Sequence, residues 1–132
     1  MLNETLFHTI AKAPTPVAPF SHAVEADGWV FVTGQMPTMP DDPNAPIPEG
    51  IEAQTHQVMH NLKIVLNEIG LGFEHVMRAG AYLTDFKKDY AAFNRVYASY
   101  FTSGKLPART CIGVTALAVD ASVEIDFIVR RP

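Results

Sequence analysis

The chain has 132 residues, 48% of them hydrophobic and 18% charged, a composition that excludes a disordered chain and a coiled coil. Ten Lys and Arg against 14 Asp and Glu give a net charge of −4 without a basic stripe, which argues against nucleic-acid binding. There is a single Cys, no apolar run of the roughly 20 residues that cross a bilayer, and no signal-peptide pattern at the start. We therefore expect a soluble cytoplasmic protein with one domain over residues 1–132.

Three short strands are predicted in the first third of the chain. "WVFVTG" at residues 29–34 is rich in β-branched and aromatic side chains, and weaker strand patterns precede it at residues 5–10 and 20–26. Alternation places Trp29 and Phe31 on one face of residues 29–34 and two valines on the other. Both faces of this strand therefore need burial, and we expect another copy of the chain to cover the second one.

The rest of the chain predicts a loop, two helices and three strands. Five prolines in residues 37–50 indicate a surface loop. Apolar residues at helical spacing predict helices over residues 51–69 and 88–101, and the tyrosines and Phe93 of the second helix are predicted to be core residues. Strand patterns follow at residues 75–85, 108–114 and 122–130. This order of elements predicts an α+β fold in which the two helices cover one face of the sheet.

Charged side chains stand within the last two predicted strands. Period 2 places Arg109 and Cys111 on one face of "ARTCIGV". In "VEIDFIV" the apolar residues form one face, and Glu124 and Asp126 point the other way, toward the expected subunit contact. We expect Arg109 to face the same direction from the neighbouring segment. Two interpretations stay open: Arg109 is the structural ion-pair partner of Glu124, or it is a receptor for an external carboxylate, which its planar fork matches.

Five segments together resemble the RidA/YjgF family of enamine/imine deaminases. They are "PFSHAV", "FVTGQMP", "FNRVYASYF", "PARTCIGV" and "VEIDFIV", in the family's order from about Pro14 to Arg130. The resemblance implies a homotrimer with a chorismate-mutase-like α+β fold, a mixed sheet and active sites in clefts between subunits. It also implies hydrolysis of reactive 2-imino acids, or their enamine tautomers, to 2-keto acids and ammonia. No metal, organic cofactor or membrane is implied, and the expected partners are small 2-imino and 2-keto acids.

The resemblance also assigns roles to individual residues. By position, Arg109 matches the arginine that grips the substrate carboxylate, and Glu124 matches the glutamate that positions water and can shuttle protons. Cys111 matches a cysteine whose backbone lines the site. A nucleophilic role for its thiol is disfavoured because no histidine or predicted helix N-terminus stands near it in the sequence. The further substrate-binding positions are Phe20, Thr33, Gly34 and Asn94.

Two of these positions depart from the family pattern. Phe20 stands where the family often has Tyr, so the flat ring is kept and a hydroxyl is lost. Thr33 stands where Ser is common and adds a methyl group. These changes preserve the implied reaction class and bear on substrate preference.

Three histidines are further candidates for chemistry. His56 and His60 have the i, i+4 spacing of a metal pair, but Gln57 replaces the glutamate of H-E-x-x-H and both histidines flank the apolar stripe. We therefore predict a solvated or packing pair. His22, near the Phe20 segment, is predicted either to touch substrate or to lie at the rim of the site.

The sequence also leaves other functions open. One is a deaminase dedicated to a single catabolic pathway, with an aminoacrylate-like or aminomuconate-like substrate. Another is an endoribonuclease or translation inhibitor, as some family members are described, although the net charge opposes it. The last is a non-enzymatic trimer that binds small acids, which the missing hydroxyl at Phe20 favours.

Overall fold

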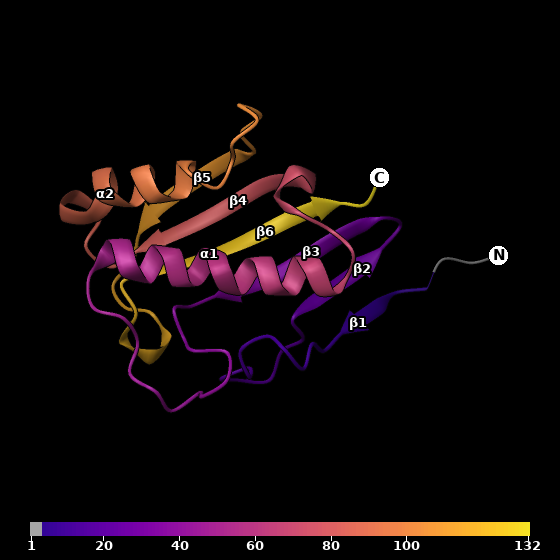
Figure 1. Ribbon diagram of the computed structural model, residues 1–132, viewed down its shortest axis with the longest axis horizontal. Helices are drawn as coiled ribbons and strands as arrows, with labels where there is room; N and C mark the ends of the chain where they lie inside the picture. The colour runs from indigo at the N-terminus through magenta and orange to yellow at the C-terminus, as the bar shows by residue number, and fades with distance from the viewer. Residues whose placement is uncertain (1–3) are drawn as a thin grey trace.

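The computed structural model describes residues 4–132. Residues 1–3 lie outside the described part of the chain. The expectation that the start carries no signal-peptide pattern falls partly on these residues. The described chain forms one six-stranded sheet with two helices on one face (Figure 1). The strands are β1 (Leu6–His8), β2 (Ala23–Ala26), β3 (Trp29–Gln35), β4 (Val76–Leu83), β5 (Ala108–Gly113) and β6 (Val123–Arg130). The helices are α1 (Ile51–Glu68) and α2 (Phe86–Ala98), and two 3₁₀ turns are η1 (Phe73–His75) and η2 (Ala118–Asp120).

The predicted fold class is confirmed: the fold is α+β, with a mixed sheet and both helices on the same side. Most predicted ranges agree with the structure within about three residues. The two N-terminal strands are shorter than predicted: β1 ends at His8 and β2 begins at Ala23, with a proline-containing loop between them. None of the helices in residues 4–132 is long and apolar enough to cross a membrane.

The core lies between the helices and one face of the sheet. In β6, Val123, Ile125, Phe127 and Val129 are at most 1% exposed and point toward the helices, whereas the residues between them are half-buried. α1 covers this face with its buried stripe and ends where Gly70 takes a positive φ of 79°, a conformation that suits glycine. α2 packs beside α1 over the β4–β5 side of the sheet (Figure 1).

The sheet order is β1-β2-β3-β6-β4-β5, so β4 separates β5 from β6. The expectation that the Arg109 segment neighbours the last strand is therefore wrong. β4, α2 and β5 form a parallel crossover, which places β5 beside β4 at the edge of the sheet. β6 then returns antiparallel between β3 and β4.

Candidate active site

The strand register places Arg109 and Glu124 on opposite faces of the sheet. Arg109 pairs with Ala79, which pairs with Phe127, so the arginine lies on the helix-covered face. Glu124 pairs with Tyr82 and lies on the open face. The expectation that both residues face the same way is wrong, and with it the structural ion pair between them. Alternation fixes the faces within one strand, but the register between strands decides which faces coincide.

The guanidinium of Arg109 lies against three rings of α2, which we call the aromatic cradle: Tyr90, Phe93 and Tyr97. Its central carbon is 4.9 Å from the ring centroid of Tyr97, 5.4 Å from that of Phe93 and 5.9 Å from that of Tyr90. Its Nη2 donates a long hydrogen bond of 3.4 Å to the Tyr90 hydroxyl. Within residues 4–132, none of the ion pairs involves Arg109. Most of its donors therefore remain available to an anion.

Cys111 and Asn94 lie beside Arg109, on the same side of the sheet. Cys111 is two residues further along the same face of β5, is half-buried and packs against the core. Burial raises the pKa of its thiol, and the nearby Arg109 lowers it in part. A raised pKa disfavours the thiolate, which agrees with a structural role for Cys111. Asn94 lies within the stripe of α2 that bears the cradle, and its Oδ1 is buried without a hydrogen-bond partner in the described chain.

Gly34 and Glu124 meet on the open face of the sheet. Val32 pairs with Phe127 and Gln35 with Ile125, so Thr33 and Gly34 form a β-bulge opposite a single residue of β6. A Cβ atom at Gly34 would overlap the carboxylate of Glu124, so a side chain there would displace this carboxylate. The bulge therefore brings the predicted Thr33, Gly34 and Glu124 together.

The surroundings of Glu124 favour the protonated form of its carboxyl. Burial, followed by repulsion from Asp126, raises its pKa above the usual 4.5. Asp126 in turn accepts a 2.8 Å hydrogen bond from the Tyr82 hydroxyl, and this bond raises the pKa of Tyr82. A carboxyl whose pKa lies closer to neutrality is better matched to general acid and base catalysis.

Phe20 lies at the surface, whereas His22 is buried. Phe20 is 37% exposed, in the loop between β1 and β2. His22 is only 2% exposed, and both of its ring nitrogens are hydrogen-bonded to backbone groups. The prediction that it touches substrate or lies at the rim of the site is therefore wrong. Of the other histidines, His56 contacts the Tyr100 hydroxyl at 2.7 Å and His60 is exposed, which agrees with a packing or solvated pair. Residues 4–132 contain no group of three or more His, Cys, Asp or Glu side chains placed to hold a metal ion.

The sequence predicts the rings of the cradle only as core residues. The burial of Phe93 and Tyr97 confirms that prediction, but these rings also carry Arg109. Tyr90, Phe93 and Tyr97 stand at i, i+3 and i+7, on one face of the helix, and an arginine follows on the next strand. This spacing is the sequence signal that would have identified the cradle.

One chain thus holds two separate halves of the predicted site. The receptor half, on the helix-covered side, consists of Arg109, Cys111 and Asn94. The carboxylate half consists of Thr33, Gly34 and Glu124 on the open face, to which we assign Phe20 because its loop is joined to Thr33 by a backbone hydrogen bond of His22. A pocket of about 570 Å³ between the C-terminal ends of α1 and α2 contains none of these residues. The lining of this pocket contains no arginine, so it offers no planar fork for a carboxylate such as Arg109 provides.

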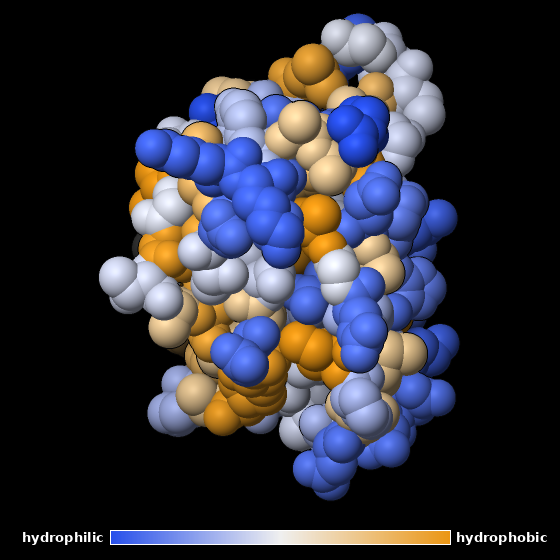
Figure 2. Space-filling view, turned by 90° about the vertical axis from the view of Figure 1, so that its left-hand side faces the viewer, coloured by the Kyte–Doolittle hydropathy of each residue, from blue (hydrophilic) through white to orange (hydrophobic). Residues whose placement is uncertain are grey.

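Exposed apolar side chains occur at one end of the molecule and, in a more regular pattern, on the open face of the sheet. Figure 2 views the end at which α1 and α2 begin, and there hydrophobic side chains are interspersed with hydrophilic ones. The exposed apolar residues with the clearest pattern lie on the open face of the sheet instead. Phe7, Val24, Phe31 and Ile128 are in register across four strands, and Phe7 is 69% and Phe31 51% exposed.

The fold defines a class of protein: an α+β domain in which the residues predicted to bind a small molecule are divided between the two sides of one sheet. Residues 10–131 match the family model described as Endoribonuclease L-PSP, so the chain belongs to that family, in which the Rid and RutC proteins are also found.

Known relatives match almost the entire chain. A RutC family protein of Synechocystis is 38% identical over 92% of this chain and 93% of its own. The crystal structure of yeast Mmf1 covers 98% of this chain and 100% of its own, with a TM-score of 0.89 and 32% identity. That of E. coli TdcF with bound serine covers 96% and 99%, with a TM-score of 0.88 and 27% identity.

Proposed function

We propose that this protein hydrolyses reactive 2-imino acids, or their enamine tautomers, to 2-keto acids and ammonia, at sites formed between copies of the chain in a homotrimer. The observation that carries the proposal is the state of Arg109. Its guanidinium is half-buried, is held against three rings and has no carboxylate partner in the described chain. Such an arrangement fits a receptor for the carboxylate of a small acid.

The cradle suits an anion that binds through two oxygens, such as a carboxylate, because it fixes the plane of the guanidinium. Stacking on rings contributes about 0.5–2 kcal/mol and limits the orientations of the cation. Two parallel hydrogen bonds from a fixed fork match the two oxygens of a carboxylate, and a hydrogen bond to a charged group contributes about 1.5–3 kcal/mol.

The reaction requires the protein to orient the imine and a water molecule and to transfer protons between them. Water adds to the imine carbon, and one of its protons passes through Glu124 to the nitrogen. In the resulting carbinolamine the proton of the new hydroxyl passes to the nitrogen as the C–N bond breaks, which releases ammonia and leaves the ketone of the 2-keto acid. The raised pKa of Glu124 supports its role as the group that accepts and returns this proton.

Two copies of the chain are needed because the sheet separates Arg109 from Glu124. The apolar row on the open face, Phe7, Val24, Phe31 and Ile128, is a surface that a second copy would cover. Docking there would bring a receptor half from one copy toward the carboxylate half of another. The bound serine of TdcF, an amino acid with one carboxylate, supports a small-acid substrate class.

The family description supplies a second candidate, endoribonuclease activity. The net charge of −4 opposes it, because RNA binding relies on neutralising phosphates. RNA cleavage by the purified protein that persists when Arg109 is removed would favour this candidate over the deaminase.

The test is the Arg109→Ala and Arg109→Lys pair with a panel of 2-imino acids that an amino-acid oxidase generates in situ. We expect Arg109→Ala to lose about 10²–10³-fold in rate, as for other preorganised donors. Arg109→Lys keeps the charge without the fork and should recover only part of the loss. Imines that lack a carboxylate should be affected far less.

Arg95→Ala is the matched control, because Arg95 is an exposed arginine on the same helix as the cradle. It should leave the deaminase rate unchanged. If Arg109→Ala melts early yet hydrolyses 2-imino acids at the rate of the unmodified protein, Arg109 is structural and the receptor assignment is wrong.

A further inference from the structure

We propose that His22 is a positioning residue of this site, which holds the Phe20 loop against the Thr33–Gly34 bulge through a neutral imidazole. The inference rests on the proposed function, since Phe20 and the bulge belong to the carboxylate half. His22 lies two residues after Phe20, directly before β2, and its backbone is hydrogen-bonded to Thr33 of the bulge.

Both ring nitrogens of His22 are used inside the protein. Nδ1 accepts a 2.8 Å hydrogen bond from the backbone N–H of Ile10, so it carries no proton. Nε2 lies 2.8 Å from the carbonyl oxygen of Pro14 and must therefore donate its proton to it. The network thus defines the tautomer, with the proton on Nε2. Because the side chain is 2% exposed, water cannot replace either bond.

The backbone of His22 extends the same connection to the bulge. Its N–H donates to the carbonyl of His8 in β1, and its carbonyl accepts from the N–H of Thr33, both at 3.0 Å. A single residue therefore joins the edge strand, the start of the loop and the bulge that meets Glu124.

The first part of the loop is also held by Ile10 and Ala13 in the core and by an exposed ion pair of Lys12 with Glu68, but the part next to Phe20 has few contacts of its own. Residues 15 and 17–20 are exposed, whereas Ala13 and Pro14, next to the imidazole contact, are buried. The other hydrogen bonds within residues 10–21 that the structure records are local turns, such as Phe20 N–H to Ala18 carbonyl at 3.0 Å. With few buried contacts, a loop of this kind depends on its anchors for a fixed position.

The chemistry explains why histidine suits this position. The imidazole places one acceptor and one donor at fixed points on a rigid ring. Glutamine offers an amide oxygen for Ile10 and an amide N–H for Pro14, so it can replace both bonds. Phenylalanine fills the volume but leaves two buried backbone groups unpaired. The pair of substitutions therefore separates hydrogen bonding from packing.

The experiment is a double-mutant cycle that combines His22→Phe with Phe20→Ala and follows kcat and KM for 2-imino acid hydrolysis. We expect His22→Phe to lower kcat/KM by about 10- to 100-fold, because small displacements of positioning groups have effects of this size. His22→Gln should restore most of the activity. In the Phe20→Ala background, His22→Phe should cause little further loss, because the two residues act through one another. His60→Phe, at an exposed histidine of α1, is the matched control and should change neither parameter.

Two results would overturn the inference. One is unchanged kinetics for His22→Phe in a folded oligomer, and the other is a full additive loss in the Phe20→Ala background, which would indicate general destabilisation. Failure of the proposed function has a different signature: the unmodified protein would hydrolyse no imine. Hydrogen exchange over residues 10–21 then still tests the anchor, since His22→Phe should accelerate it and His22→Gln should not. Unchanged exchange in His22→Phe would refute the positioning role.

Discussion

The proposed proton-transfer role of Glu124 goes together with a cost in stability. Its raised pKa means that the folded protein prefers the protonated carboxyl. The stability that this preference contributes is fully present below the unfolded pKa and is lost as pH rises through the folded pKa. At neutral pH the ionised, partly buried Glu124 is therefore unfavourable for folding.

This sign predicts opposite effects of Glu124→Gln on activity and on stability. The amide cannot shuttle a proton, so imine hydrolysis should fall by about 10²–10⁴-fold. At neutral pH the variant should unfold at a higher temperature than the unmodified protein, and this advantage should disappear at about pH 4, below the unfolded pKa. Thermal unfolding at several pH values measures it, with Glu49→Gln, an exposed glutamate, as the control. A variant that is less stable at neutral pH would contradict the assigned cause of the shift.

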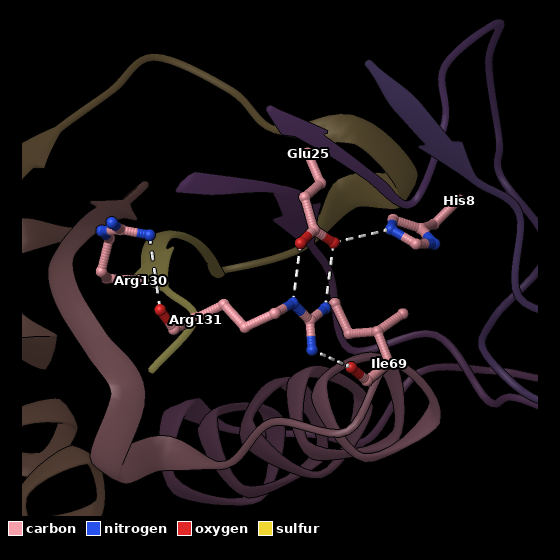
Figure 3. A network of polar contacts seen from close by, with 5 residues as sticks. All are labelled: His8, Glu25, Ile69, Arg130 and Arg131. Atoms are coloured by element: carbon pink, nitrogen blue, oxygen red, sulfur yellow. Dashed lines mark hydrogen bonds and ion pairs between the residues drawn. The ribbon is translucent and has the colours of Figure 1, made fainter. Parts of the chain in front are cut away.

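At the scale of elements, Arg131 connects the end of α1 to strand β2, which pairs with the edge strand β1 (Figure 3). Arg131, just after β6, donates from Nε and Nη2 to both carboxylate oxygens of Glu25 in β2, at 2.7 and 2.9 Å. Its Nη1 donates to the carbonyl of Ile69 at the end of α1, at 2.9 Å. His8 of β1 contacts the same carboxylate at 3.1 Å. Four segments thus converge on one ion pair, in which Glu25 is 8% exposed.

Removing Arg131 should therefore destabilise the fold. In Arg131→Met the aliphatic stem is kept, but Glu25 loses its two charged hydrogen bonds, at a cost of about 1–3 kcal/mol, reduced because water partly screens the arginine. Arg131 is the main cause of the lowered pKa of Glu25, so the stabilisation is present above its unfolded value of 4.5 and is lost as pH falls through the folded pKa. The difference in unfolding free energy between the two proteins should be large at neutral pH and small in acid. Arg130→Met, beside it and stacked on Trp29, is the control; an equal loss in both variants would refute this account.

The sequence predicts the elements well and their mutual placement poorly. Period 2 correctly places Arg109 and Cys111 on one face, and Glu124 and Asp126 on another face of their own strand. It cannot relate the two pairs, because β4 enters between β5 and β6 through a crossover that no local pattern encodes. The bulge at Thr33 and Gly34 is equally invisible, since it depends on pairing with β6.

At the scale of the whole molecule, the sheet separates Arg109 from Glu124, so the proposed site requires a second copy of the chain. The open face carries Glu124 and the exposed Phe31, and the opposite side carries Arg109. If each site takes its receptor half from one copy and its carboxylate half from another, an Arg109→Ala chain and a Glu124→Gln chain each retain one intact half. Each variant alone has no intact site, but a mixed oligomer does.

Coexpression of these two variants should therefore restore deamination. With random mixing in a ring, an intact site needs a Glu124→Gln copy on the receptor side and an Arg109→Ala copy on the other, so about a quarter of the sites should recover. Light scattering and differential tags verify that mixed trimers have formed, and mixing the two proteins without subunit exchange is the control. If both halves served one substrate within a single chain, every chain would carry a damaged site and the mixture would stay at the rate of the separate variants. Such a result, in verified mixed trimers, would reject a site shared between subunits, whereas recovery requires Arg109 and Glu124 to act on the same substrate from different copies.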